Sequence, residues 1–240
     1  MDEDRESCSF VPLAITNMSE TTLCVAGVNP DTNKWIRPVE PGFHCLFENH
    51  LNWFPQNTIV KACFGDAQPR SESEDPHGLH GEDFPVINQP HILSGLTATT
   101  KLVVLKNAAD STLLNEIGAS NRSMFLVHVE DFKLDLHNEA DLRLVHFQGG
   151  GTNLASFRSH LDLNFPFIGI SSKGIPCRMR GCNEFLRLAQ EDGHIIGMAQ
   201  ILTTHPYADV YFALSLSSLF EGKHWMILAG IHVVGDEIWL

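Results

Sequence analysis

A cluster of basic residues lies in the C-terminal half of the sequence, opposed only by Glu184 within a stretch of fifteen residues. The cluster consists of Lys173, Arg178, Arg180 and Arg187. Side chains of an extended chain alternate between two faces, so Arg178 and Arg180 share one face and Cys177 and Met179 the other. Two guanidinium groups at this spacing suit successive phosphates or the carboxylates of a partner. An equal alternative is that these two arginines simply form the solvated face of a strand and bind no ligand.

A second candidate is the segment Trp35-Ile36-Arg37-Pro38-Val39, in which period two places Trp35 and Arg37 on one side. An exposed tryptophan beside an arginine can stack on a base and contact a phosphate. The alternative is that Trp35 packs in the core and Arg37 has a purely structural role. This alternative is favoured because a tryptophan on a strand is usually packed. Pro38 cannot donate to a β-ladder, so this strand is expected to lie at a sheet edge or to end there.

Asp209 and the triplet Glu221-Gly222-Lys223 resemble the metal-nuclease pattern of an Asp followed by an acidic residue, any residue and Lys. The triplet occupies a predicted hairpin turn, where charged residues are expected without any chemistry. Asp209 begins the preceding strand, roughly 30 Å from the turn if that strand is unbroken. We therefore expect no catalytic residues here.

Histidine and cysteine supply no predicted metal site. The six cysteines are sparse and irregular, which favours reduced thiols over a disulfide framework. His77 with His80, and His44-Cys45 with His50, are the closest groupings of metal-ligating residue types. Four ligands with matching spacing cannot be assembled from them, so neither a metal nor a cofactor is predicted.

Charge is distributed unevenly along the chain. The net charge is -13, and the first 100 residues contain 5 basic and 14 acidic residues. This portion would be repelled by a phosphate backbone, which argues against non-specific coating of DNA. The longest nearly uncharged apolar stretch, residues 225–235, is shorter than the roughly 20 residues of a membrane-spanning helix. The acidic N-terminus is unlike a secretion signal, so a cytoplasmic protein without membrane contact is expected.

Alternation of apolar and polar residues predicts short strands along most of the chain. The predicted strands are 10–17, 22–28, 34–39, 58–64, 102–105, 123–129, 131–137, 142–147, 176–180, 193–203, 210–216 and 225–233. The residues at 29–33 and 221–223 favour turns, which predicts a hairpin at each position. Helix signals are confined to residues 110–117 and 181–190.

These elements predict an all-β protein made of two linked OB-like five-stranded barrels with one or two short helices. The first barrel is expected over residues 1–95, with an exposed acidic loop at 71–90, and the second over residues 96–240.

The chain also resembles the bacterial dual-OB domain family. The resemblance lies in Cys24-Val25-Ala26-Gly27, in Trp35-Ile36-Arg37-Pro38-Val39 and in the C-terminal hairpin, where Ser217-Ser218 replaces an Arg that members often carry. It implies two linked OB-like barrels that bind nucleic acid or a nucleotide in a bacterial defence or mobile-element setting, and it implies no known catalytic residues.

Together these features predict a non-catalytic binding subunit that engages nucleic acid or a nucleotide within a larger bacterial assembly. The expected binding residues are Trp35, Arg37, Lys173, Arg178 and Arg180. Two alternatives remain, namely a metal-dependent nuclease and an adaptor that binds only protein.

Overall fold

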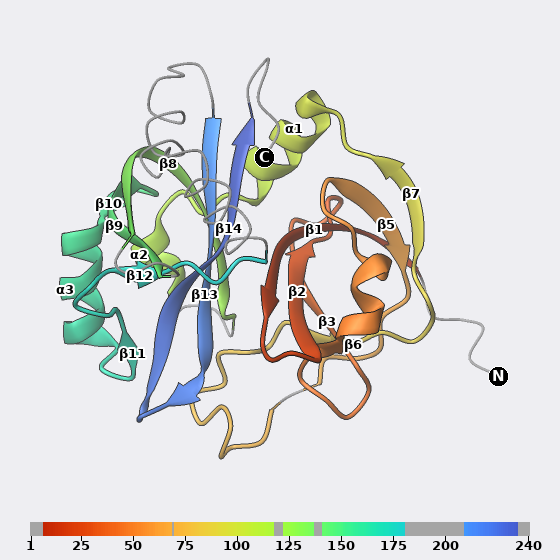
Figure 1. The fold of residues 1–240 in the computed structure, drawn as a ribbon, viewed down its shortest axis with the longest axis horizontal. Coiled ribbons are helices and arrows are strands. Elements are labelled where there is room, and N and C mark those ends of the chain that lie inside the picture. Colours follow the sequence, from red (N-terminus) through yellow and green to blue (C-terminus); the bar gives the residue numbers. More distant parts are fainter. Residues whose placement is uncertain (1–6, 69, 118–121, 137–140, 181–208, 235–240) are drawn as a thin grey trace. The chain divides into compact units, whose positions relative to one another are not determined.

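A computed structural model describes residues 7–68, 70–117, 122–136, 141–180 and 209–234, and these form two compact units (Figure 1). Unit 1 comprises Met1–Ala108 with Ser120–Met124, and unit 2 comprises Ala109–Ala119 with Phe125–Leu240. The division falls after Ala108 rather than after residue 95, because helix α1 (Ala98–Ala108) belongs to unit 1. The fold is mostly β, with two curled sheets that are consistent with two linked OB-like barrels.

Unit 1 contains a seven-stranded sheet in the order β6-β3-β2-β1-β5-β7, with β4 paired to β2. The strands are β1 (Cys8–Asn17), β2 (Thr22–Val28), β3 (Trp35–Val39), β4 (Leu46–Phe47), β5 (Thr58–Ala62), β6 (Asp83–Pro85) and β7 (His91–Gly95). The predicted hairpin between β2 and β3 is confirmed, with Val28 opposite Trp35. Of the five strands of ordinary length, β1, β2, β3 and β5 were predicted and β7 was not, and β4 and β6 are short additional strands.

Pro38 lies next to the end of β3, which was one of its two predicted positions. The other position, an open edge, is excluded because β6 pairs with β3 in parallel. The ladder avoids the missing N–H of Pro38: Arg37 donates to the carbonyl of Glu82 at 2.7 Å, and Val86 donates to the carbonyl of Val39 at 2.9 Å.

The core of unit 1 consists of apolar side chains from its strands, together with Phe54 after η1 and Val86 after β6. They are Phe10, Ile15, Leu23, Val25, Ile36, Leu46, Phe54, Val60 and Val86. Phe10 and Phe54 pack edge to face with ring centroids 5.4 Å apart. The 3-10 helix η1 (Glu48–Trp53) follows β4, and its Leu51 and Trp53 pack against this core.

Unit 2 contains the second seven-stranded sheet, in the order β10-β9-β8-β13-β14-β11, with β12 paired to β9. Its long strands are β8 (Met124–Leu136), β9 (Leu142–Gly149), β13 (Asp209–Phe220) and β14 (Lys223–Val234). Its two-residue strands are β10 (Thr152–Asn153), β11 (Ile168–Gly169) and β12 (Ile175–Pro176). The runs 123–129 and 131–137, predicted as separate strands, form the single strand β8.

The C-terminal hairpin of β13 and β14 is confirmed, with Phe220 opposite Lys223 across the turn. The burial of its two faces differs from the prediction. Alternation predicts one buried face, but Tyr211, Ala213 and Ser215 are buried on one face and Phe212 and Leu214 on the other, so β13 is covered on both sides. In the first half of β14, His224, Met226 and Leu228 are buried, and Trp225 and Ile227 between them are half-buried.

Two helices occur where the sequence predicted a strand or no element. The predicted strand 102–105 is part of α1, which begins where the Thr97 hydroxyl accepts from the backbone N–H of Thr100 at 3.1 Å. Helix α3 (Leu154–Asn164) was not predicted and is capped by the Asn153 side chain. The predicted helix at 110–117 is shortened to α2 (Leu113–Glu116).

The predicted helix 181–190 and strand 193–203 lie outside the described residues. None of the helices within the described part of the chain is long and apolar enough to cross a membrane.

Candidate functional site

Trp35 and Arg37, predicted as surface binding residues, are both buried in β3. Arg37 is 3% exposed, and its Nε donates to Oδ1 of Asp83. Its Nη1 lies 3.1 Å from the Ser123 hydroxyl and 3.8 Å from Oε1 of Glu82. The guanidinium is therefore directed at carboxylates inside unit 1, so the core alternative describes Trp35 and Arg37.

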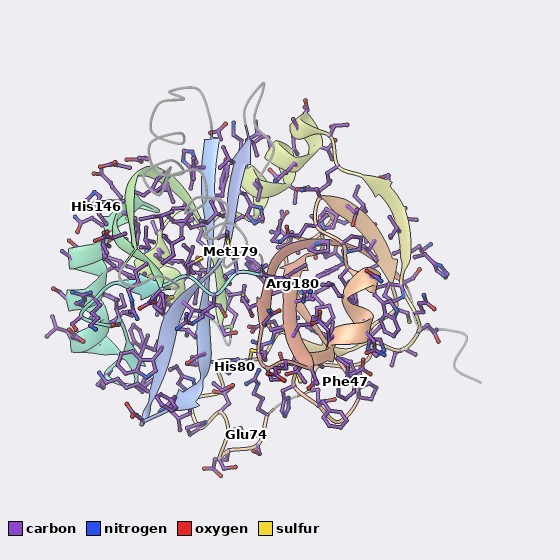
Figure 2. All side chains as sticks on the ribbon, viewed as in Figure 1. Phe47, Glu74, His80, His146, Met179 and Arg180 are labelled. Atoms are coloured by element: carbon purple, nitrogen blue, oxygen red, sulfur yellow. The ribbon has the colours of Figure 1, made fainter. Side chains whose placement is uncertain are left out.

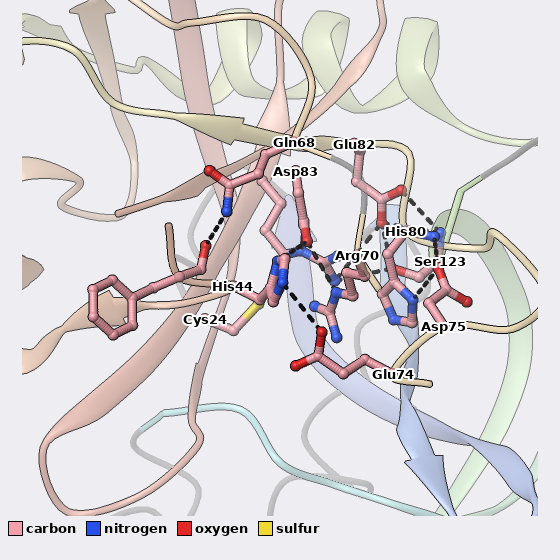
Figure 3. Close-up of polar contacts among 12 residues, drawn as sticks. Cys24, His44, Gln68, Arg70, Glu74, Asp75, His80, Glu82, Asp83 and Ser123 are labelled. Atoms are coloured by element: carbon pink, nitrogen blue, oxygen red, sulfur yellow. Dashed lines mark hydrogen bonds and ion pairs between the residues drawn. The ribbon is translucent and has the colours of Figure 1, made fainter. Parts of the chain in front are cut away.

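Asp83 is the centre of this buried ion network (Figure 3). Its second oxygen, Oδ2, accepts from Nε of Arg70 at 3.0 Å and lies 3.5 Å from Nδ1 of His44. Burial opposes a charge on Arg37, yet the carboxylates of Glu82 and Asp83 raise its pKa above the ordinary value. A buried carboxylate held between two guanidiniums fixes the position of β6 against β3.

The acidic segment 71–90, expected to be an exposed loop, is partly built into the interior. Asp75, His80, Glu82 and Asp83 are buried, and β6 lies within the segment. Oδ2 of Asp75 accepts from the backbone N–H of His80 at 2.8 Å and lies 3.0 Å from its Nδ1. Burial lowers the pKa of His80 to about 4. Asp75, Glu82 and Asp83 are thus part of the interior of unit 1, whereas Glu72 and Glu74 are exposed, as the prediction of a loop requires.

His44 and His50, two of the histidines weighed as metal ligands, face carboxylates of unit 1. His44 Nε2 lies 3.6 Å from Glu74, and its other ring nitrogen faces Asp83. His50 contacts Glu40 through Nδ1, and its ring stacks on Trp53 with centroids 3.9 Å apart. These are pairings of a histidine with one or two carboxylates, which need no ion to explain them.

Three residues of the predicted basic cluster, Lys173, Arg178 and Arg180, lie on unit 2 in the segment that follows β11, and Arg187 lies outside the described residues. Lys173 and Arg178 are exposed, and Arg180 is half-buried. The predicted strand 176–180 is reduced to β12 and an isolated bridge between Cys177 and Leu228. Cys177 is buried and Arg178 is exposed, but Met179 and Arg180 are both half-buried, so the predicted alternation does not extend to them. Figure 2 labels Arg180 at the end of this segment. We call Lys173, Arg178 and Arg180 the basic edge.

Two further arginines, which the sequence analysis missed, support the loop that carries Lys173. Nη1 of Arg143, on β9, donates to the Ser171 hydroxyl at 3.2 Å and to the Gly174 carbonyl at 3.4 Å. Nη2 of Arg158, on α3, donates to the Ser171 carbonyl at 2.9 Å. Gly174 has a φ of +101° and closes the loop. The loop is therefore held from two elements, and Lys173 projects from a fixed backbone.

The pattern that resembled a metal nuclease is not brought together in space. Asp209 pairs with Val234 at the open end of the hairpin, whereas Glu221 lies in the turn at the other end. Asp209 instead contacts His128, with Oδ1 3.2 Å from Nε2. Glu221 and Gly222 have φ values of 52° and 77°, the left-handed pair expected of a two-residue hairpin turn. The charges at the turn are explained by its geometry.

Comparisons with known proteins add no assignment. The chain matches no model of a protein family and no curated protein.

Proposed function

We propose that the chain is a non-catalytic binding protein that engages nucleic acid or a nucleotide through the basic edge of unit 2. The observation that carries the proposal is the exposure of Lys173 and Arg178 on a segment whose loop is fixed by Arg143 and Arg158. OB-like barrels bind oligonucleotides across one face, where basic side chains follow the phosphates. A fixed backbone reduces the entropy lost when Lys173 is ordered on a ligand.

The resemblance to the bacterial dual-OB domain family supports the same class of ligand. Its Cys24-Val25-Ala26-Gly27 segment forms most of β2, and Trp35–Val39 forms β3. We place the chain in the cytoplasm as one subunit of a bacterial defence or mobile-element assembly.

The direct test is binding of a fluorescently labelled oligonucleotide, as single-stranded DNA and as RNA, followed by anisotropy at several salt concentrations. Replacing Lys173 and Arg178 together by Glu should weaken binding and flatten the plot of log affinity against log salt by roughly one to two units. The matched control is Lys61→Glu, which reverses an exposed lysine on β5 of unit 1. Equal affinity and slope in the double variant and the control would remove the basic edge from the site.

The same experiment separates the two alternatives. Adding magnesium should leave the oligonucleotide intact, and Glu221→Ala should leave binding unchanged, because Asp209 and Glu221 lie at opposite ends of β13. Cleavage that requires magnesium and is lost in Glu221→Ala would instead identify a nuclease. A chain that binds no oligonucleotide and no nucleotide would be an adaptor for protein alone.

A further inference from the structure

Unit 1 presents a row of four rings on β4, on η1 and in the turn before β4. Phe43 and Phe47 have ring centroids 5.5 Å apart, Phe47 and His50 6.2 Å, and His50 and Trp53 3.9 Å. Phe43 is 52% exposed and Phe47 38% exposed, while His50 and Trp53 are half-buried. We call these four residues the aromatic row, and Figure 2 labels Phe47 within it. A continuous row of rings that ends in two exposed phenylalanines is unusual on a polar surface.

The turn that presents Phe43 is braced rather than loose. Phe43 donates its backbone N–H to the Glu40 carbonyl at 2.9 Å, and Gly42 supplies the positive φ of +80° that the turn requires. The Gln68 amide then bonds the turn twice. Its oxygen accepts from the N–H of Gly42 at 3.1 Å. Its nitrogen, drawn in Figure 3, donates to the Phe43 carbonyl at 2.8 Å. An exposed phenylalanine held in this way is preorganised for contact, because little backbone freedom remains to be lost.

The charges around the aromatic row are predominantly negative. Glu40 contacts His50, Glu48 begins η1 immediately after Phe47, and Glu74 faces His44 beside Phe43. Arg70, a basic residue of this part of unit 1, directs its Nε to the buried Asp83. The first 100 residues as a whole carry 14 acidic against 5 basic residues. Ring faces attract cations, and acidic neighbours add to this attraction.

We propose that the aromatic row is the docking site for an arginine-rich segment of a protein partner. A guanidinium stacks on an aromatic face and pairs with carboxylates at the same time, which suits Phe43 and Phe47 beside Glu48 and Glu74. A single-stranded nucleic acid also stacks on rings, but its phosphates would be repelled by these carboxylates. The inference concerns unit 1 and does not rest on nucleic-acid binding by unit 2.

The test uses the full chain and a fluorescein-labelled peptide of alternating arginine and glycine, with labelled oligothymidylate as the second probe. The variant is Phe43→Ala with Phe47→Ala. The matched control is Leu163→Ala, which removes a side chain that is 82% exposed on α3 of unit 2. Because all three side chains are exposed, the variants should fold, and equal thermal unfolding midpoints would establish this. Glu74→Lys forms a second variant that keeps the rings and reverses one neighbouring charge.

The peptide should bind the unaltered chain and Leu163→Ala equally, and about tenfold more weakly to the double phenylalanine variant. Glu74→Lys should also weaken peptide binding, by a smaller factor that shrinks at high salt. Equal peptide affinity in all variants, or no peptide binding by the unaltered chain, would overturn the proposal. Loss of oligothymidylate binding in the phenylalanine variant, with peptide binding intact, would show that the row stacks bases. The basic-edge variant of unit 2 should leave peptide binding unchanged, so the two proposals can fail separately.

Discussion

At the scale of single residues, the buried charges of unit 1 illustrate how an ion network is satisfied in an apolar setting. Asp83 is fully buried, but it accepts from Arg37 and Arg70, so its two oxygens both have cationic partners. The Ser123 backbone N–H donates to Oε1 of Glu82 at 2.9 Å. Burial raises the pKa of Glu82, while Arg37 and Ser123 oppose that effect. Removing one member of such a network leaves its partner charged and unpaired, which is more costly than removing both.

His80 makes the stability of the chain depend on pH. Burial lowers its pKa from 6.5 to about 4, although the contact with Asp75 works in the other direction. Between these two values the unfolded chain binds a proton that the folded chain does not, so the free energy of unfolding should fall as the pH falls from 6.5 to 4. The loss attributable to His80 should reach about 3 kcal/mol at the low end. Urea unfolding measured across this range checks the prediction.

His80→Asn keeps a donor near Asp75 and removes the titrating ring, so it should flatten this pH dependence. His91→Asn, at an exposed position on β7, is the control and should leave the dependence as it is. Parallel pH profiles for the unaltered chain and His80→Asn would contradict the assignment. The pKa of Asp75 is also lowered, by hydrogen bonds from His80 and Leu79 that outweigh its burial. Its contribution is lost only at more acidic pH, as the carboxylate is protonated.

Among the strands, the close approach of β1 to β2 explains why a glycine occupies the last position of the Cys24-Val25-Ala26-Gly27 segment. The register between β1 and β2 shifts between Pro12 and Ala14, which brings the backbone of β1 over Gly27. A Cβ at Gly27 would lie 2.0 Å from the Val11 carbonyl oxygen and 2.9 Å from the Phe10 ring. Only a residue without a side chain permits this approach of the two strands.

Gly27→Ala should therefore destabilise the chain by about 3 kcal/mol, the upper end of the usual cost of overpacking. The control is Gly95→Ala on β7, where a Cβ would meet only the Asn57 carbonyl at 3.9 Å. Its free energy of unfolding should stay within about 0.5 kcal/mol of the unaltered chain. Denaturant unfolding of the three proteins gives the comparison, and equal losses in both variants would show that the close approach at Gly27 carries no cost.

Alternation predicted most of the longer strands because a half-buried strand exposes every second residue. In β8, Phe132 and Leu134 are buried, whereas Asp131, Lys133 and Asp135 are exposed. Alternation could not identify α1, whose Leu102–Leu105 run is as apolar as a strand. The signal that decides for a helix is the Thr97 hydroxyl at its start. Alternation located β13 but not the burial of its second face, because a strand covered on both faces carries apolar residues at positions of either parity.

The candidate site was only partly predictable, for a related reason. The exposure of Arg178 could be predicted from local spacing, since Arg178 and buried Cys177 are neighbours in the chain. The burial of Arg37 could not be predicted in this way, because its carboxylate partner Asp83 lies 46 residues away in the sequence. The brace on the Lys173 loop was missed likewise, because Arg143 reaches Ser171 from another strand. Long-range pairing of charges leaves no periodic signal in a single sequence.

At the scale of the whole molecule, charge is distributed so that the two proposed surfaces attract opposite partners. The chain carries a net charge of -13, and most of it lies in the first 100 residues, which contain the aromatic row. The basic edge is a local feature of unit 2, and its Lys173 and Arg178 are exposed. The electrostatic interactions of exposed charges are screened over about 8 Å at physiological salt. Each surface therefore acts mainly on groups that contact it.

This distribution predicts selectivity between kinds of nucleic acid. A long DNA duplex presents a dense line of phosphates, and binding it without sequence preference requires many cationic contacts spread over the protein surface. Lys173, Arg178 and Arg180 supply only a few such contacts, and the acidic remainder of the chain would be repelled by the flanking phosphates. At 150 mM salt, a gel-shift experiment should therefore show no complex with a long random-sequence duplex. A short single strand, whose phosphates can follow the basic edge alone, should still bind in the anisotropy assay. A stable duplex complex whose affinity falls steeply with salt, as expected when many counterions are released, would contradict this prediction. Such a complex would require a larger basic surface than the basic edge provides.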